Sequence, residues 1–251
     1  MNTIKRLVLS KLESTQREGL LKYLTGNYKF LSIDWIKQKY WYLLTCILSS
    51  KELFSLIYAR NLWGNDESVS GPGSTLHATN KIRDTLPRLF NRLEIKSILD
   101  IPCGDFNWMK HIALGNIHYL GADIVPELIE KNQQLYRTKN RDFITLDIIT
   151  DKLPKVDIVF CRDCLVHLKN QDVIKALSNI KNSGTTYLLT TQFPDHKTNS
   201  ELSTDYWRPI NLEEKPFSLP PPILSILEGH YEPGYADKSL GLWKIENLHF
   251  F

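Results

Sequence analysis

Apolar residues between positions 95 and 195 alternate between two spacings, one typical of strands and one typical of helices. The β-rich runs are Lys96–Ile101, His118–Asp123, Asp142–Asp147, Val156–Cys161 and Thr186–Phe193. The helical stretches between them are Asn107–Leu114, Pro126–Leu135 and Gln171–Lys181. This order predicts a parallel sheet with helices on both faces. The carboxyl ends of its strands then lie at one edge, where open α/β sheets bind ligands.

The residues before this region have other patterns. Residues 1–60 repeat apolar residues near helical spacing, which predicts a helical N-terminal extension to a domain formed by residues 61–251. The glycine-rich stretch 61–74 is expected to be a loop. The next helix is expected over Thr75–Leu93, with Ser74 as a candidate N-cap.

The C-terminal part of the chain differs again. Proline and polar residues are frequent from residue 194 onward, and residues 194–239 are expected to form an insertion that covers the substrate. Leu240–Ile245 has the composition of a final strand, which we place at an antiparallel end of the sheet.

Composition narrows the class of protein. The 251 residues are 42% hydrophobic and 24% charged, which excludes a disordered chain, a collagen and a coiled-coil rod. Four cysteines are too few for a secreted disulfide scaffold and suggest a reducing, cytoplasmic location. The most apolar run, Tyr40–Leu48, is shorter than the roughly 20 residues that a membrane-spanning helix needs. No signal peptide or transmembrane segment is therefore predicted.

Charge is concentrated at the N-terminal end. The whole chain has a formal net charge of +3, and residues 1–60 hold ten basic and four acidic residues. Such a basic, aromatic-bearing arm suits peripheral contact with an anionic membrane, a nucleic acid or a partner, or it forms the solvated face of helices. The pattern does not distinguish such an arm from an oligomer interface.

The segment Ser97–Asp105 carries the most specific signal for ligand binding. It is an apolar strand that ends in an acid, followed by a tight turn containing Gly104. Backbone N–H groups in such a turn face the ligand, and Gly104 allows the ligand to approach closely. The chain lacks both G-x-G-x-x-G and the P-loop motif, which disfavours a pyrophosphate ligand. Asp100 instead suits a ligand with a positive charge.

The sequence ILDIPCGDFNWM, which begins at Ile98, resembles motif I of the class I S-adenosylmethionine-dependent methyltransferases. Pro102 and Cys103 replace the usual glycine-bearing stretch. The resemblance covers residues 95–195 well. It implies a Rossmann-like, doubly wound, mostly parallel seven-stranded sheet with S-adenosylmethionine as cofactor and S-adenosylhomocysteine as product.

The resemblance also implies roles for the acids that end the next strands. Asp123 takes the position of the acid that binds the ribose of the cofactor. Asp147 takes that of the residue that contacts the adenine amino group, with Ile148 stacking beside it. The residues assigned to the cofactor in this way are Asp100, Pro102, Cys103, Gly104, Asp123, Ile124, Asp147, Ile148 and Arg162.

The resemblance implies that the segment after the fourth strand, residues 161–167, faces the acceptor and the methyl group. Cys161, Cys164 and His167 have the types of zinc ligands, but a second ligand pair is missing, so neither zinc nor a redox dithiol is favoured. A neutral histidine accepts a proton near pH 7. We therefore predict His167 as the proton acceptor, with Asp163 orienting it or acting as the base.

Candidate acceptor-binding residues come from two segments. The glycine-rich loop is expected to act as a lid over the site, and the tail offers aromatic and hydrogen-bonding groups that suit a sugar or a carboxylated metabolite. The predicted acceptor residues are Tyr58, Trp63, Ser70, Gln192, Trp207 and Arg208. The expected reaction is O-methylation of a sugar, a glycan or another small hydroxylated acceptor, in loose likeness to methyltransferases of the bacterial polysaccharide type.

Metal-assisted chemistry and nucleic-acid methylation fit the sequence less well. Asp163 with Asp195 and His196 offers ligands for Mg²⁺, but the adjacent acid pair typical of metal-assisted relatives is missing, so we predict no metal site. The segment after strand four lacks the Asn/Asp-Pro-Pro-aromatic pattern, which disfavours nucleic acid as acceptor. Two hypotheses stay open beside O-methylation: N-methylation of a small amine, and a methyltransferase-like binding module without turnover.

Overall fold

The computed structural model describes residues 44, 48–202, 206–229 and 234–248. Most of the predicted N-terminal extension therefore lies outside the described residues. The part that is described includes helix α4 (Ser50–Arg60). Ser49 caps this helix: its hydroxyl accepts from the Glu52 backbone N–H, and the Glu52 carboxylate accepts from the Ser49 backbone N–H.

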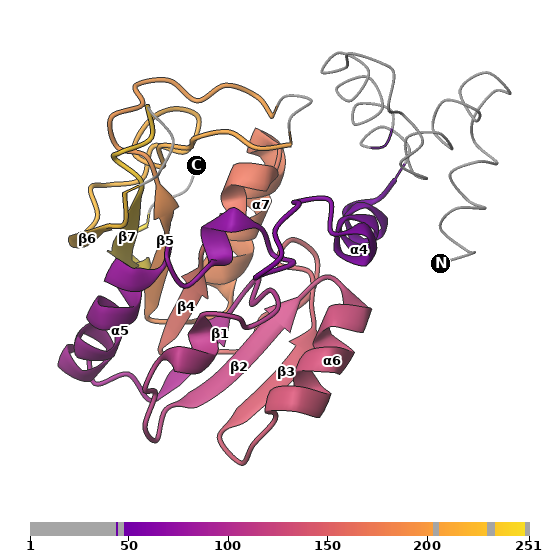
Figure 1. The fold of residues 1–251 in the computed structure, drawn as a ribbon. Helices are drawn as coiled ribbons and strands as arrows, with labels where there is room; N and C mark the ends of the chain where they lie inside the picture. Colours follow the sequence, from indigo (N-terminus) through magenta and orange to yellow (C-terminus); the bar gives the residue numbers. More distant parts are fainter. Residues whose placement is uncertain (1–43, 45–47, 203–205, 230–233, 249–251) are drawn as a thin grey trace, which may run out of the picture.

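The strands form one seven-stranded sheet in the order β3-β2-β1-β4-β5-β7-β6 (Figure 1). The strands are β1 (Ser97–Asp100), β2 (His118–Asp123), β3 (Arg141–Thr145), β4 (Ile158–Cys161), β5 (Tyr187–Gln192), β6 (Leu224–Leu227) and β7 (Ser239–Lys244). The first five are parallel, and β7 and β6 continue the sheet, with β7 antiparallel to both β5 and β6. The predicted doubly wound, mostly parallel fold is confirmed.

The helices cover both faces of the sheet. Helices α5 (Asn80–Arg92) and α6 (Pro126–Tyr136) pack with one set of strand residues, while α7 (Asn170–Asn182) packs with the opposite set (Figure 1). Consecutive residues of a strand point to opposite faces of the sheet. In β1, Ile98 belongs to the core that includes α5 and α6, and Leu99 belongs to the core that includes α7. Because both faces are buried at the centre of the sheet, β1 and β4 read as almost continuous apolar runs.

Three local expectations were wrong. The stretch Asn107–Leu114 forms only a 3₁₀ turn, η2 (Met109–His111), since a segment this short gains little from helix propagation. Helix α5 begins at Asn80, five residues later than expected, so Ser74 is not its cap. Ser74 instead ends the 3₁₀ turn η1 (Pro72–Ser74), which begins at a proline.

The predicted insertion also contributes to the sheet. Strand β6 arises from within residues 194–239 and forms the edge next to β7. Its residues are mostly exposed, so it lacks the buried pattern by which the other strands were recognised. None of the helices in the described part of the chain combines the length and apolarity needed to cross a membrane.

Candidate active site

A cavity of about 1140 Å³, open to solvent, lies at the carboxyl ends of the parallel strands. Its walls come from the turns after β1, β2, β3 and β4, from α4 and from the loop before α5. Predicted site residues that line it are Asp100, Pro102, Cys103, Gly104, Asp123, Ile124, Asp147, Ile148, Arg162, Tyr58, Trp63, Ser70, Asp163 and His167. The fold thus brings together residues that are more than 100 positions apart in the sequence.

Gly104 lies in the turn after β1, at the point where the loop before α5 packs against this turn. Its φ is +53°, and a Cβ at this position would lie 2.4 Å from the Ser70 hydroxyl oxygen. The Asp105 backbone N–H donates to the same hydroxyl at 2.9 Å. The structure gives two reasons for this glycine that were not predicted: its missing side chain makes room for the loop, and it permits the left-handed backbone.

Gly104→Ala is expected to destabilise the protein, because it combines a strained φ with a contact to Ser70. The unfavourable backbone conformation alone costs about 1–2 kcal/mol. Urea denaturation of the variant measures the loss. Gly115→Ala is a matched control, since Gly115 has a φ of +56° but open space around its Cβ position. Equal losses in the two variants would contradict the role of the loop contact.

Asp123 closes the same turn through its carboxylate. The backbone N–H of Gly104 donates to Oδ2 at 3.2 Å and that of Val125 donates to Oδ1 at 3.1 Å. Burial raises the pKa of Asp123 to about 6, even though these N–H groups act in the opposite direction. Each carboxylate oxygen keeps a lone pair for a hydroxyl-bearing ligand.

Asp100 ends β1 at the floor of the cavity and is buried. The Tyr119 hydroxyl donates to its Oδ2 at 2.5 Å. Burial raises the pKa of Asp100 to about 8, although this hydrogen bond and the charge of Arg162 act in the opposite direction. An acid in such a place favours binding of a cation, because a positive charge stabilises the ionised form.

Asp147 and Ile148 form the wall after β3. The carboxylate of Asp147 accepts from the Ile149 backbone N–H at 2.8 Å, which fixes the turn by an Asx hydrogen bond. Ile148 is buried and belongs to the core shared with α7. Both a carboxylate and an apolar side chain from this turn therefore line the cavity.

Arg162 follows β4 and is buried in a network of charges. It pairs with Glu228 at 2.7 Å and with Asp163 at 3.1 Å. Its Nη2 also donates to the Gly73 carbonyl at 3.0 Å, and its guanidinium lies 5.5 Å from the centre of the Trp108 ring. Arg162 thereby joins strand β4 to the loop before α5.

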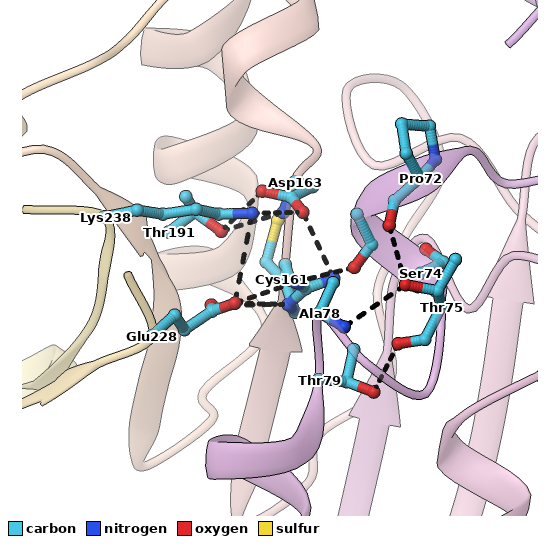
Figure 2. A network of polar contacts seen from close by, with 12 residues as sticks. Pro72, Ser74, Thr75, Ala78, Thr79, Cys161, Asp163, Thr191, Glu228 and Lys238 are labelled. Carbon is cyan, nitrogen blue, oxygen red and sulfur yellow. Dashed lines mark hydrogen bonds and ion pairs between the residues drawn. The ribbon is translucent and has the colours of Figure 1, made fainter. Parts of the chain in front are cut away.

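Asp163 forms its hydrogen bonds and ion pairs with residues other than His167, the partner that was predicted. Its Oδ2 pairs with Lys238 at 2.7 Å, and its backbone N–H donates to Thr191 Oγ1 at 2.8 Å (Figure 2). Burial alone would raise the pKa of Asp163, but Arg162 and Lys238 outweigh burial and hold it well below its usual range. Such a carboxylate is a weak base, and its oxygens bind other partners than the His167 ring.

His167 is oriented by a backbone group instead. Its Nδ1 lies 2.5 Å from the Tyr206 carbonyl oxygen, which only accepts, so Nδ1 carries the proton. The other nitrogen, Nε2, is then an acceptor. Burial lowers the pKa of His167, so the ring is neutral at pH 7. Phe54 and Trp63 lie beside it, with ring centroids at 6.2 and 5.2 Å.

Three predicted acceptor residues do not line the cavity. Gln192 is fully buried in β5. Trp207 packs edge-on against Phe193 and Tyr235 in the tail. Arg208 donates to the Ser200 and Val166 carbonyls and to the Asn170 side chain, so its hydrogen bonds hold the tail in place. Trp207 and Arg208 therefore support the fold of the tail, and Gln192 is part of the sheet.

No group of metal ligands occurs among the described residues. His196 faces Asp237 at 3.6 Å, and neither it nor Asp195 lines the cavity with Asp163. Glu228 pairs with Arg162, Lys238 pairs with Asp163, and Trp108 lies beside the Arg162 guanidinium; these three residues were not among the predicted site residues. For Glu228 and Lys238 the sequence shows only a charged residue in the tail, and it does not reveal that the charge is buried.

Comparisons with known proteins agree with this architecture. Residues 99–183 match the family model described as a methyltransferase domain. The N-methyltransferase NodS from Bradyrhizobium japonicum WM9, in complex with S-adenosyl-L-homocysteine, is 14% identical with a TM-score of 0.57, over 75% of this chain and 97% of that one. Magnesium protoporphyrin IX methyltransferase from Synechocystis PCC 6803, with bound S-adenosylmethionine, is 14% identical with a TM-score of 0.53, over 78% and 97%.

Other matches are partial. Human N-acetylserotonin methyltransferase, in complex with S-adenosylmethionine, is 17% identical with a TM-score of 0.45, over 61% of this chain. The chain spans 44% of that protein, and 58% of the Synechocystis enzyme in its complex with S-adenosylhomocysteine. No curated protein sequence matches the chain. The matched domain model and the shared fold agree with the motifs in the sequence: residues 99–183 are similar to a methyltransferase domain, and the chain shares the fold of S-adenosylmethionine-dependent methyltransferases.

Proposed function

We propose that this enzyme transfers the methyl group of S-adenosylmethionine to a hydroxyl group on an uncharged, ring-bearing acceptor such as a sugar. The observation that carries the proposal is the position of His167, whose Nδ1 is bound to the Tyr206 carbonyl and whose ring lines the same cavity as Asp100 and Asp123. A hydroxyl needs a proton acceptor to become a good nucleophile, and a neutral imidazole nitrogen is suited to that task.

The residues present fit the cofactor. Asp100 is a buried acid that a cation would stabilise in its ionised form, and Asp123 retains acceptor capacity for hydroxyl groups. Asp147 and Ile148 offer a hydrogen-bond acceptor next to an apolar face, as an adenine ring requires. When bound, S-adenosylmethionine would supply an electrophilic methyl group on a sulfonium centre.

The remaining chemistry belongs to the side chains of the protein. His167 accepts the proton of the acceptor hydroxyl at Nε2, and the Tyr206 carbonyl stabilises the resulting imidazolium through the Nδ1–H bond. Burial of His167 keeps its pKa below the ordinary value, so the base is ready at neutral pH. Asp163 remains ionised beside the ring and adds electrostatic stabilisation to the imidazolium.

We infer the chemical class of the acceptor from the residues that line the cavity around His167. Phe54 and Trp63 lie beside the His167 ring, Tyr58 also lines the cavity, and aromatic rings stack on the apolar faces of sugars and other rings. Among the described lining residues, the cationic side chain is Arg162, which is already paired with Glu228 and Asp163. An uncharged acceptor is therefore favoured over a carboxylated one.

Cofactor affinity is expected to rise with pH between 6.5 and 8. Because the pKa of Asp100 is about 8 in the unliganded protein, binding of a cationic ligand at neutral pH must release a proton. The gain is at most about tenfold per pH unit. The same shift makes the unliganded protein lose stability as pH rises from about 4 toward 8, since an unfolded aspartate ionises near pH 3.9.

Calorimetric titration with S-adenosylmethionine in two buffers of different ionisation enthalpy measures this proton release. Asp100→Asn removes the titrating group and should make the affinity independent of pH over this range. A wild-type affinity that does not change between pH 6.5 and 8 would contradict the assignment of Asp100 to the charged end of the cofactor.

The proposed reaction is tested with a panel of matched acceptors. Formation of S-adenosylhomocysteine is followed with neutral glycosides and phenols, with their amino analogues and with their carboxylated analogues. The proposal expects turnover with the neutral hydroxyl compounds. Turnover with amines alone would replace it with N-methylation. Cofactor binding without turnover on any member of a broad panel would favour a binding module.

A further inference from the structure

Two charged residues of the tail, Glu228 and Lys238, lie at the ends of the β6–β7 hairpin, outside the cavity lining. Both are buried, with relative exposures of 6% and 5%. The Glu228 backbone N–H donates to the Lys238 carbonyl at 2.9 Å, which fixes the two residues relative to each other. They are referred to below as the hairpin pair.

The hairpin pair completes a closed set of alternating charges with Arg162 and Asp163 (Figure 2). Glu228 accepts from both Nε and Nη2 of Arg162, at 3.1 and 2.7 Å, so it holds the guanidinium from the side. Lys238 Nζ lies 2.7 Å from Asp163 Oδ2 and 3.9 Å from Glu228 Oε2. The four charges balance, although removing them from water is costly.

Buried charge networks are seldom more stabilising than well-packed apolar residues of similar volume. This network instead holds Arg162 in one position. In that position Arg162 donates to the Gly73 carbonyl at 3.0 Å. Gly73 is also close to two other residues of the network: a Cβ at this position would be 3.3 Å from Asp163 Oδ2 and 4.0 Å from Lys238 Nζ.

Gly73 belongs to a segment that we call the cover loop, residues 66–75. Its other end is held by the turn after β1, where Asp105 accepts from the Ser68 hydroxyl at 2.9 Å and from the Val69 backbone N–H at 3.0 Å. Ser70 and Ser74 from this loop line the cavity. The loop is therefore attached at one end to the turn of the proposed cofactor site and at the other to the charge network.

We infer that Glu228 and Lys238 are positioning residues for the methyl-transfer site: they fix Arg162, and through Arg162 they hold the cover loop over the cofactor end of the cavity. The tail thereby contributes to the site through charge and geometry, without contacting a ligand. The inference concerns the loop itself, and only its effect on affinity rests on the proposed cofactor site.

The test combines hydrogen exchange with ligand binding in the full chain. Lys238→Met should make the cover-loop amides, including those of Val69, Gly71 and Ser74, exchange about tenfold faster, as expected for loss of one charge-assisted contact. Strand β1 should keep its protection. The dissociation constant of S-adenosylhomocysteine, measured by calorimetry, should rise by about the same factor. Lys238→Arg, which keeps the cation, should restore both values.

Lys244→Met is the matched control, because Lys244 ends β7, the strand that Lys238 precedes, and pairs with exposed Glu246 away from the cavity. Should Lys238→Met fail to fold, the charge-balanced double variant Glu228→Gln/Lys238→Met gives the same readouts. Unchanged loop exchange in either variant would overturn the inference, as would faster exchange of loop and core together. If wild-type protein binds no S-adenosylhomocysteine, the proposed cofactor site fails, while loop exchange still decides the inference.

Discussion

Replacing His167 with alanine is expected to lower kcat by about 10²–10⁴-fold, because a positioned general base contributes an acceleration of that size. The affinity for S-adenosylhomocysteine should stay close to that of the wild type, since the proposed cofactor contacts come from the turns after β1, β2 and β3. Steady-state kinetics with an acceptor found in the panel, together with calorimetry, measures the two effects separately.

The pH dependence gives a second readout of the same base. Burial lowers the pKa of His167, so activity should fall as pH drops through a value below about 6.5, where the ring becomes protonated. The charged groups that act on the ring are Asp163, Lys238 and Arg208, and Asp163 raises its pKa while the other two lower it. The alanine variant should lack this limb of the profile.

His196→Ala is the control for the loss of a histidine. His196 stacks on Tyr235 at a centroid distance of 5.9 Å and does not line the cavity. Its removal should leave kcat and the pH profile unchanged within about twofold. If His167→Ala retained most of the wild-type kcat, the proposed base would be wrong, and a nucleophile that needs no proton acceptor, such as a neutral amine, would be favoured.

The sequence was informative where function depends on local patterns. Asp100 and Asp123 end β1 and β2, and Asp147 lies two residues after the end of β3, so parallel topology alone puts these acids at one edge of the sheet. The position of His167 follows from the same argument, because it ends the short 3₁₀ turn η3 (Leu165–His167) that follows β4. Each of these features depends on residues that are close together in the chain.

The side-chain contacts that were not predicted join residues that are far apart in the sequence. Arg162 pairs with Glu228 and Asp163 pairs with Lys238, residues that lie 66 and 75 positions further along the chain. Sequence spacing suggested that Asp163 would face His167, yet Asp163 adopts a φ of +52° and turns to Lys238 and Thr191. Arg208 has the chemistry of a binding residue, and only its hydrogen bonds to backbone carbonyls reveal that it holds the tail.

The second large effect is expected from Arg162→Met, measured as the free energy of unfolding in urea at pH 7. The variant removes a cation whose side chain is 4% exposed and leaves Glu228, at 1% exposure, without its main partner. Breaking a buried ion pair from one side costs about 3–5 kcal/mol, because an uncompensated charge remains. Arg137→Met is the control: this residue pairs with Asp142 at the surface, with 63% of its side chain exposed, and its loss should cost about 1 kcal/mol or less.

A double variant separates charge balance from lost packing. In Arg162→Met/Glu228→Gln the remaining charges, Asp163 and Lys238, still compensate each other at 2.7 Å. The double variant should therefore unfold at a higher urea concentration than Arg162→Met alone, although it carries one more substitution. Destabilisation that simply adds from the two single variants would mean that the charges act independently. A recovered stability combined with weak cofactor binding would show that the network serves the position of the cover loop more than the stability of the fold.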